Sequence, residues 1–227
     1  MPLGAFRINS LAKAAAAPAG PRPFTITTYN DAQVDTAQSK FGGASMLLDG
    51  SDYVEFDIGD LNWGSGDFTI EFWYRPNTLA SVDIIWDGRR ESGSNVPVIY
   101  WQSNIVYRIG GSDVIVTSSS LSTGTWYHIA VVRSSGTTKV YVNGTQSGSS
   151  YTDSTTYNAG LTRLGNFHSG TGFGVDGHLD EIRVSSVARY TTSFTPSASA
   201  FTNDSDTILL IHADGADAST TFTDDNS

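Results

Sequence analysis

The sequence predicts an all-β protein, a two-sheet antiparallel sandwich of the jelly-roll type with an extended N-terminal arm. Three observations support this prediction: many short runs alternate apolar and polar residues, glycine-containing turn pairs separate the runs, and no helical periodicity lasts longer than a turn or two. The chain has 227 residues, of which 39% are hydrophobic and 11% aromatic, so it can bury a large core. This length suits a single β domain.

The clearest strand covers residues 68–75, where Phe68, Ile70, Phe72 and Tyr74 share one face and a Pro-Asn pair follows. Turn pairs such as Asn-Gly and Asp-Gly divide the remaining runs into segments of strand length. Further strands are expected at residues 45–48, 53–56, 82–86, 96–101, 105–109, 114–117, 126–133, 138–142, 161–164 and 178–184. Strands of this number and spacing favour a sandwich.

Charge is distributed unevenly along the chain. The formal net charge is −10, yet Arg7, Lys13 and Arg22 make the first 22 residues basic, whereas residues 203–227 carry six Asp and no Lys or Arg. An acidic protein lacks the basic surface that nucleic acid requires, so a nucleic-acid partner is excluded. The absence of cysteine excludes thiol chemistry.

The N-terminal arm is expected to be extended, because prolines interrupt it and Lys13 breaks its apolar part, which argues against an export signal. Its apolar residues would dock on a partner and become ordered on binding: Phe6, Ile8, Leu11 and Phe24. The alternative is a mobile terminus. No run approaches the length of a membrane-spanning helix, so membrane insertion is not expected.

Several blocks of sequence, in order, resemble the concanavalin A-like, laminin G-like jelly-roll domain: residues 41–50, 53–56, 67–76, 124–133, 140–144 and 177–184. The following segment, residues 187–196, resembles the version found in phage virion proteins and large bacterial surface proteins. The resemblance implies an N-terminal arm at residues 1–35, a laminin G-like domain at 36–202, and an acidic C-terminal segment at 203–227 that resembles the first strand of another module.

Laminarinase-type glycosidases on this fold carry Glu-x-Asp-x-x-Glu on one strand, and Glu55, Asp57 and Asp60 resemble that motif in part. The third acid is Asp60, which is one carbon short, and Gly59 is expected to end the strand before it. We therefore expect a solvated strand face and no catalytic residue. His128, within a predicted strand, is expected to be structural.

A sugar-binding platform requires exposed aromatic rings beside hydrogen-bonding side chains. The candidate ligand-binding residues come from three neighbouring segments: Trp86, Arg89, Arg90, Trp101 and Tyr107. Two alternatives stay open, since the tryptophans can face the core and the arginine pair can serve a salt bridge.

Calcium is the one cofactor considered, because relatives of this fold often hold it with loop carboxylates. The candidate ligands are Asp52, Asp87 and Asp176, although aspartate next to glycine is also common in turns for backbone reasons.

The apolar run Ile208, Leu209, Leu210 and Ile211 predicts a strand near the C-terminal end. This strand either folds back onto its own sheet or pairs with the edge of another copy or module, because an unpaired apolar edge promotes aggregation. Both outcomes require backbone ladder hydrogen bonds, and the second would support a homo-oligomer.

These features together favour a non-enzymatic virion structural protein, such as a phage capsid fibre, decoration or tail component on the virion surface. Its arm would bind other virion proteins and its loops would contact host surface glycans. The alternative is a bacterial cell-surface or secreted carbohydrate-binding module, and a laminarinase-type glycoside hydrolase ranks third.

Overall fold

The computed structural model describes residues 23–58, 64–89, 95–157, 161–168, 170 and 172–226, and these residues contain strands but no helix. No helix long and apolar enough to cross a membrane is therefore found in this part of the chain. The strands are β1 (Ile26–Tyr29), β2 (Gln33–Asp35), β3 (Ser45–Asp49), β4 (Tyr53–Asp57), β5 (Phe68–Pro76), β6 (Asp83–Asp87), β7 (Val98–Trp101), β8 (Ile105–Ile109), β9 (Ser112–Val116), β10 (Tyr127–Ser134), β11 (Thr137–Val142), β12 (Thr145–Gln146), β13 (Tyr151–Thr152), β14 (Leu161–Leu164), β15 (Asp176–Ser185) and β16 (Thr207–Ile211).

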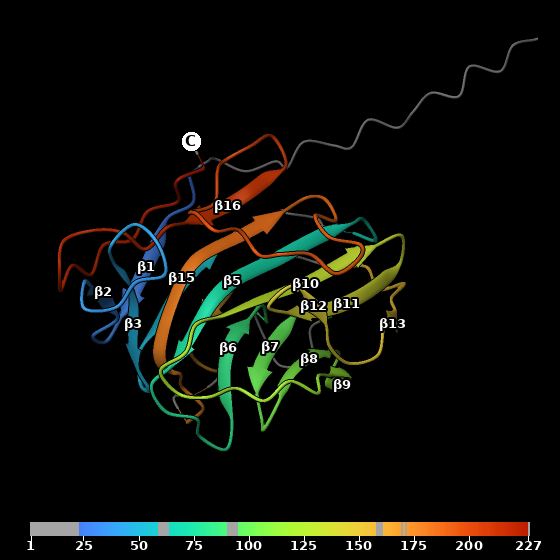
Figure 1. Ribbon diagram of the computed structural model, residues 1–227, viewed down its shortest axis with the longest axis horizontal. Coiled ribbons are helices and arrows are strands. Elements are labelled where there is room, and N and C mark those ends of the chain that lie inside the picture. The colour runs from blue at the N-terminus through green and yellow to red at the C-terminus, as the bar shows by residue number, and fades with distance from the viewer. Residues whose placement is uncertain are drawn as a thin grey trace, which may run out of the picture.

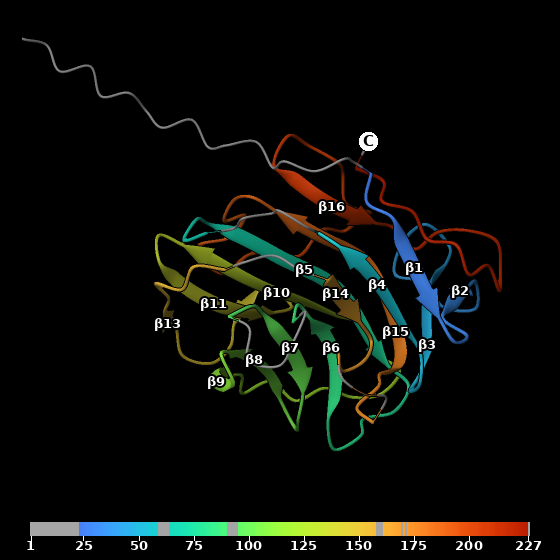
Figure 2. The ribbon, with the colours of Figure 1, turned by 180° about the vertical axis from the view of Figure 1, so that it is seen from behind.

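The strands form two antiparallel sheets, as the sequence predicted. One sheet has seven strands in the order β1-β4-β14-β6-β7-β8-β9. The other has nine, in the order β12-β11-β10-β5-β15-β3-β2, with β13 paired to β11 and β16 paired to β15. Figures 1 and 2 show the sandwich from opposite sides, with β16 running along β15 at one rim.

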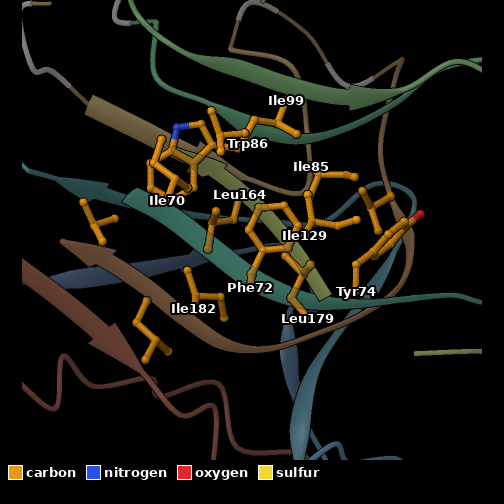
Figure 3. Packing of buried hydrophobic residues seen from close by; sticks show 14 of the residues in the cluster. Ile70, Phe72, Tyr74, Ile85, Trp86, Ile99, Ile129, Leu164, Leu179 and Ile182 are labelled. Carbon is orange, nitrogen blue, oxygen red and sulfur yellow. The ribbon is translucent and has the colours of Figure 1, made fainter. Parts of the chain in front are cut away.

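The core lies between the sheets. Phe68, Ile70, Phe72 and Tyr74 of β5 are all at most 1% exposed, which confirms the alternation predicted for this strand. Figure 3 shows residues of both sheets meeting there, with Leu164 and Trp86 of the seven-stranded sheet facing side chains of β5 and β15. Burial of this many aromatic and branched side chains is the main source of stability.

The outer face of the nine-stranded sheet is also covered, over part of its length, by the segment 186–206. Tyr190 and Phe194 of this segment pack on Ala130, Val132 and Tyr141 of the sheet. The polar face of β5 is therefore buried as well, and Thr69 and Glu71 are fully inaccessible.

Beneath this covering segment, the Glu71 carboxylate accepts a hydrogen bond from each of three side chains. Oε1 accepts from Arg183 Nε at 2.9 Å and Nη2 at 2.6 Å. Oε2 lies 3.1 Å from His128 Nε2 and accepts from the Tyr190 hydroxyl at 2.9 Å. The structural role expected for His128 fits this position, since its ring is buried against a carboxylate.

The two ends of the described chain belong to the sandwich, which changes the expected boundaries. Residues 26–35, expected in the arm, supply β1, which pairs with β4, and β2, which pairs with β3. Phe24 packs against the chain's own core, so its expected docking on a partner is not what the structure shows. The other arm residues proposed for docking, Phe6, Ile8 and Leu11, lie outside the described residues.

The expected ladder for residues 208–211 is confirmed, and of the two outcomes the structure shows the fold-back. β16 pairs with the second half of β15, in register from Ile182↔Ile211 to Val184↔Leu209, on the side where β3 pairs with the first half. Ile208, Leu209, Leu210 and Ile211 are buried within their own chain, so they do not offer an edge to a second copy.

After β16 the chain returns to the N-terminal strands. The segment 203–227 was expected to begin another module, but its described part, residues 203–226, completes this one instead. Val34 exchanges backbone hydrogen bonds with Ala218 and Ser219. Asp224 accepts from the backbone N–H of Phe24 at 3.0 Å. The C-terminus accordingly lies close to the start of β1 in Figure 2.

Candidate functional site

Three of the residues proposed for ligand binding lie in the core. Trp86 and Tyr107 are fully buried and Trp101 is 6% exposed, all within the main apolar cluster. Figure 3 shows Trp86 beside Ile99 between the two sheets. The platform proposed from these rings is therefore wrong, and the alternative, that the tryptophans face the core, is what the structure shows.

The reason is strand alternation, because neighbouring residues of a strand point to opposite faces. On β7 and β8 the outward residues include Tyr100 and Arg108, each one position away from a proposed residue. The Tyr100 hydroxyl and Arg108 Nη1 both donate to Asp113, at 2.8 and 2.7 Å.

Arg89 does lie on the outer side of the seven-stranded sheet, where it forms a salt bridge, as one alternative anticipated. Its Nε and Nη2 donate to the two oxygens of Asp87, each at 2.7 Å, and its guanidinium lies 4.6 Å from the centre of the Phe167 ring. Arg90 lies outside the described residues.

A stacked pair of aromatic rings lies near the β1 edge of this sheet. Tyr29 of β1 and Tyr53 of β4 are register partners, and their rings stack at 4.5 Å with an interplanar angle of 16°. Tyr29 is 37% exposed, one of the few large apolar side chains of the described chain that solvent reaches to this extent.

A charged pair borders these rings. Arg163 of β14 donates from Nε and Nη2 to Glu55 Oε1, at 2.9 and 2.5 Å, and its guanidinium lies 3.8 Å from the centre of the Tyr53 ring. A hydrogen bond to Glu55 is the main reason why the pKa of Tyr29 lies above its usual value, and the negative charge of Glu55 adds to it.

We call these four residues, Tyr29, Tyr53, Glu55 and Arg163, the tyrosine–arginine face. Arg163 Nη1 also donates to the carbonyl oxygen of Phe167 at 2.7 Å, which connects the face to the loop that carries Arg89's aromatic partner. Beyond that loop, Val82 and Phe167 cover the apolar residues of β6 to β8. Over β1 this sheet reaches solvent at Tyr29, and at its opposite edge Ser112, Asp113 and Val116 of β9 are exposed as well.

The sequence contains a signal that can locate part of this face. Tyr53 and Glu55 are two apart in a predicted strand and so share a side. Tyr29 and Arg163 come next to these two residues because β1 and β14 both pair with β4. These pairings join distant parts of the chain, so no local sequence pattern predicts them.

The acidic residues considered as catalytic groups or calcium ligands do not form such a site, and Glu55 and Asp52 have other partners. Glu55 is held by Arg163, Asp57 is exposed, and Asp60 lies outside the described residues. Asp52 accepts from the backbone N–H groups of Asp31 and Asp49, at 2.9 and 3.0 Å, as expected for a turn residue.

Asp87 pairs with Arg89, and Asp176 accepts from the Asn77 side chain at 3.3 Å. Among the described residues, no group of three or more His, Cys, Asp or Glu side chains is placed to hold a metal ion. The three proposed calcium ligands are thus not brought together.

Comparison with known sequences defines the class of this protein. The profile of the concanavalin A-like lectin/glucanases superfamily, laminin G type, matches residues 48–193, which is more than half of the chain. The chain belongs to this family. No curated protein sequence matches it significantly.

Among solved structures, domain 4 of the extracellular arabinanase AbnA from Geobacillus stearothermophilus, solved in complex with arabinotriose, is similar, with a TM-score of 0.57 and 23% identity over 73% of this chain and 83% of that one. The botulinum neurotoxin serotype C1 binding domain is similar with a TM-score of 0.55 and 15% identity, over 74% of this chain and 45% of that one.

A mutant of Trypanosoma rangeli sialidase displaying trans-sialidase activity is similar with a TM-score of 0.57 and 10% identity, over 74% of this chain and 28% of that one. This chain thus spans less than half of the neurotoxin domain and of the sialidase. At these identities the similarity establishes a shared fold.

Proposed function

We propose that this protein is a non-enzymatic carbohydrate-binding module that holds an oligosaccharide on the tyrosine–arginine face. The observation that carries the proposal is the placement of a partly exposed stacked tyrosine pair beside a fixed arginine–glutamate pair on an accessible sheet face. Sugar rings stack their C–H faces on aromatic rings, and their hydroxyls bond to charged side chains that are already positioned. The arabinotriose complex of the similar arabinanase domain supports this class of ligand.

The chemistry of Glu55 argues for binding over hydrolysis. A retaining glycosidase uses two carboxyl groups on opposite sides of the scissile bond, with one of them protonated. Instead, Nε and Nη2 of Arg163 both donate to one oxygen of Glu55, so this carboxylate already has a partner, and Asp57 on the same strand is exposed. If a glycan is nevertheless hydrolysed and Glu55→Gln abolishes that activity, the non-enzymatic assignment is wrong.

The test is a glycan array followed by calorimetry, beginning with arabino-oligosaccharides. Tyr29→Ala removes a partly exposed ring with little effect on the core, and we expect it to weaken binding about tenfold, since an aromatic contact of about 1.5 kcal/mol corresponds to that ratio in Kd. Arg163→Ala is expected to weaken binding at least as much.

Arg108→Ala is the matched control, because Arg108 is also an outward arginine of the same sheet paired with a carboxylate, Asp113. It should leave Kd unchanged. Equal binding by all three variants, or no bound oligosaccharide at all, would refute the site.

The setting of the module is a separate proposal. We infer that the module is displayed on a phage virion, in an oligomer anchored by the N-terminal arm. The inference rests on the apolar residues of the arm and on the resemblance of residues 187–196 to the version of this domain found in phage virion proteins and large bacterial surface proteins. A bacterial cell-surface or secreted module is the alternative. Deletion of residues 1–22 should abolish incorporation into particles while the melting temperature stays the same, and unchanged incorporation would exclude arm docking.

A further inference from the structure

β15 contains a bulge that places a carboxylate inside the protein. Between Asp180 and Arg183 the register with β5 shifts, and Glu181 adopts φ +51°, a left-handed conformation that residues other than glycine rarely take. Its side chain is fully inaccessible. A buried negative charge requires partners that compensate it, and those of Glu181 come from the C-terminal part of the chain.

The Glu181 carboxylate joins two segments. Oε2 accepts a hydrogen bond from the backbone N–H of Phe201, near the end of the covering segment, and Oε1 lies 2.8 Å from His212 Nδ1. Among the described residues, His212 is the only side chain that forms a salt bridge with Glu181, and it is 26% exposed. The compensation of this buried charge therefore depends on a titratable group that solvent reaches.

His212 begins the returning C-terminal segment, which comprises residues 212–226. Its backbone N–H donates to Asp225 Oδ2 at 3.3 Å, so the two ends of the segment are joined. Between these ends the segment runs along β2, where Val34 exchanges backbone hydrogen bonds of 2.8 Å with it. β2 is the last strand of the nine-stranded sheet, so this segment covers an edge that would otherwise be open to strand pairing.

We propose that the His212–Glu181 pair is a pH-sensitive latch, which holds the returning C-terminal segment on the edge of β2 in mildly acidic solution and loosens it as the pH rises. A hydrogen bond from a protonated imidazole to a carboxylate is roughly twice as strong as one between neutral groups. A neutral imidazole can still donate from Nδ1, but the buried carboxylate then lacks a counter-charge. The edge of β2 consequently becomes available to another strand above neutral pH.

The other charged groups around the pair act in the same direction. Three acids surround it: Asp180 on β15, and Asp214 and Asp225 of the returning C-terminal segment. Lys40 also contacts Asp180, but it does so through its backbone N–H, and its ammonium lies 4.0 Å from the centre of the Trp73 ring. Deprotonation of His212 therefore leaves the repulsion among the acids without compensation from the imidazolium.

The pKa of His212 gives the sign of the effect. The hydrogen bond with Glu181 is the main reason why this pKa lies above its ordinary value of 6.5. Burial opposes the shift, and the negative charges of Glu181, Asp225 and Asp214 add to it. A raised folded-state pKa contributes stability that is complete below pH 6.5 and is lost as the pH rises through the folded-state pKa.

The two neighbouring acids with raised pKa values follow the same rule. Burial raises the pKa of Asp180 to about 7 and also raises that of Asp214. For Asp180 the loss of stability begins near the ordinary value of 3.8 and extends to about pH 7. No opposing change arises from these acids, so the returning C-terminal segment is held most firmly in acid.

Hydrogen exchange of the full chain at about pH 5.5 and about pH 8.5, on either side of the histidine transition, tests the latch. The reporters are the backbone N–H groups of Val34 and Ala218, which donate across the contact between β2 and the segment. His212→Asn keeps a side-chain donor near the position of Nδ1 but carries no charge at either pH. We expect this variant to lower both protection factors about fivefold at the lower pH and to match the wild type within about twofold at the higher pH.

His168→Asn is the matched control, because His168 is also partly buried but lies beside β6 of the seven-stranded sheet, where its backbone N–H donates to Asp87 at 3.0 Å. The protection of Val34 and Ala218 should not change in this variant. The N–H of Val131, in β10, reports on the rest of the fold and should keep its protection in both variants.

Three results would refute the latch: an equal loss of protection at both pH values, no loss at either, or a loss at Val131 as large as that at Val34. If His212→Asn does not fold, the imidazole signals of the wild type decide, because by ¹H NMR the His212 transition should lie above pH 6.5 and a transition below it would overturn the proposal. No oligosaccharide takes part in these measurements, so their outcome is independent of the proposed function.

Discussion

Replacement of Glu71 by glutamine tests whether the covering segment is held by a buried charge. The substitution keeps the shape of the side chain and removes its negative charge. Arg183, which is 8% exposed at its side chain, would lose its anionic partner, while His128 and Tyr190 would face an amide in place of a carboxylate.

The magnitude follows from burial. Removal of one member of a buried ion pair costs about 3–5 kcal/mol, because the other charge stays buried without compensation. For a domain of this size each kcal/mol lowers the melting temperature by about 2–4 °C, so Glu71→Gln should melt about 6–20 °C lower.

The pH dependence gives a second readout. Burial by itself would raise the pKa of Glu71, but the hydrogen bond with His128 and the charge of Arg183 outweigh burial and lower it below its ordinary value of 4.5. A depressed folded-state pKa contributes stability that is present above pH 4.5 and is lost as the pH falls through the folded-state pKa. The difference between wild type and variant should therefore be full at pH 7 and shrink in acid.

Urea unfolding at pH 7 and below pH 4 measures both effects. Asp204→Asn is the matched control, since Asp204 also pairs with an arginine of the covering region, Arg189, at 2.7 Å, but its side chain is 43% exposed. It should cost no more than about 1 kcal/mol. A loss for Glu71→Gln within 1 kcal/mol of the control, or one that does not change with pH, would refute the reasoning.

Two further perturbations test the packing of the outer segments. Gly144→Ala should lower the free energy of unfolding by about 2–4 kcal/mol, because φ is +76° there and a Cβ would collide with the Phe194 carbonyl oxygen. Gly43→Ala is the control, since φ is +99° there but the space around a Cβ is open, and it should cost about 1–2 kcal/mol. Equal losses for the two variants in thermal denaturation would contradict the clash. Deletion of residues 207–226 removes the partner of the second half of β15 and should cause aggregation in size-exclusion chromatography, whereas a monomer with wild-type melting would show that β16 is dispensable.

Local patterns in the sequence predict the core well. The alternation of Phe68, Ile70, Phe72 and Tyr74 needs only a strand and one buried face, and all four residues lie in the core. Burial of Glu71 on the opposite face is not predictable in this way, because its cover comes from residues more than a hundred positions later in the chain.

Sequence patterns missed the tyrosine–arginine face because they do not establish which residues of each strand point to the core and which point to solvent. A register irregularity between Ile84 and Trp86 lets Ile85 and Trp86 both enter the core, so alternation cannot be counted through this strand. The tyrosine–arginine face depends on pairings such as Tyr29↔Tyr53, which only the tertiary fold specifies. The sequence thus predicts where aromatic and charged residues gather, and the structure decides which of them face solvent.

The position of Phe24 next to Asp224 has a mechanical consequence. Force applied through these two positions enters the molecule at one corner, where Phe24 and Thr28 bond to the returning C-terminal segment. Tension would first peel that segment away from β1 and β2, one hydrogen bond at a time, and would leave the rest of the sandwich unstretched. When the module is loaded at these two positions, the force passes through the returning C-terminal segment, so both sheet faces keep their shape.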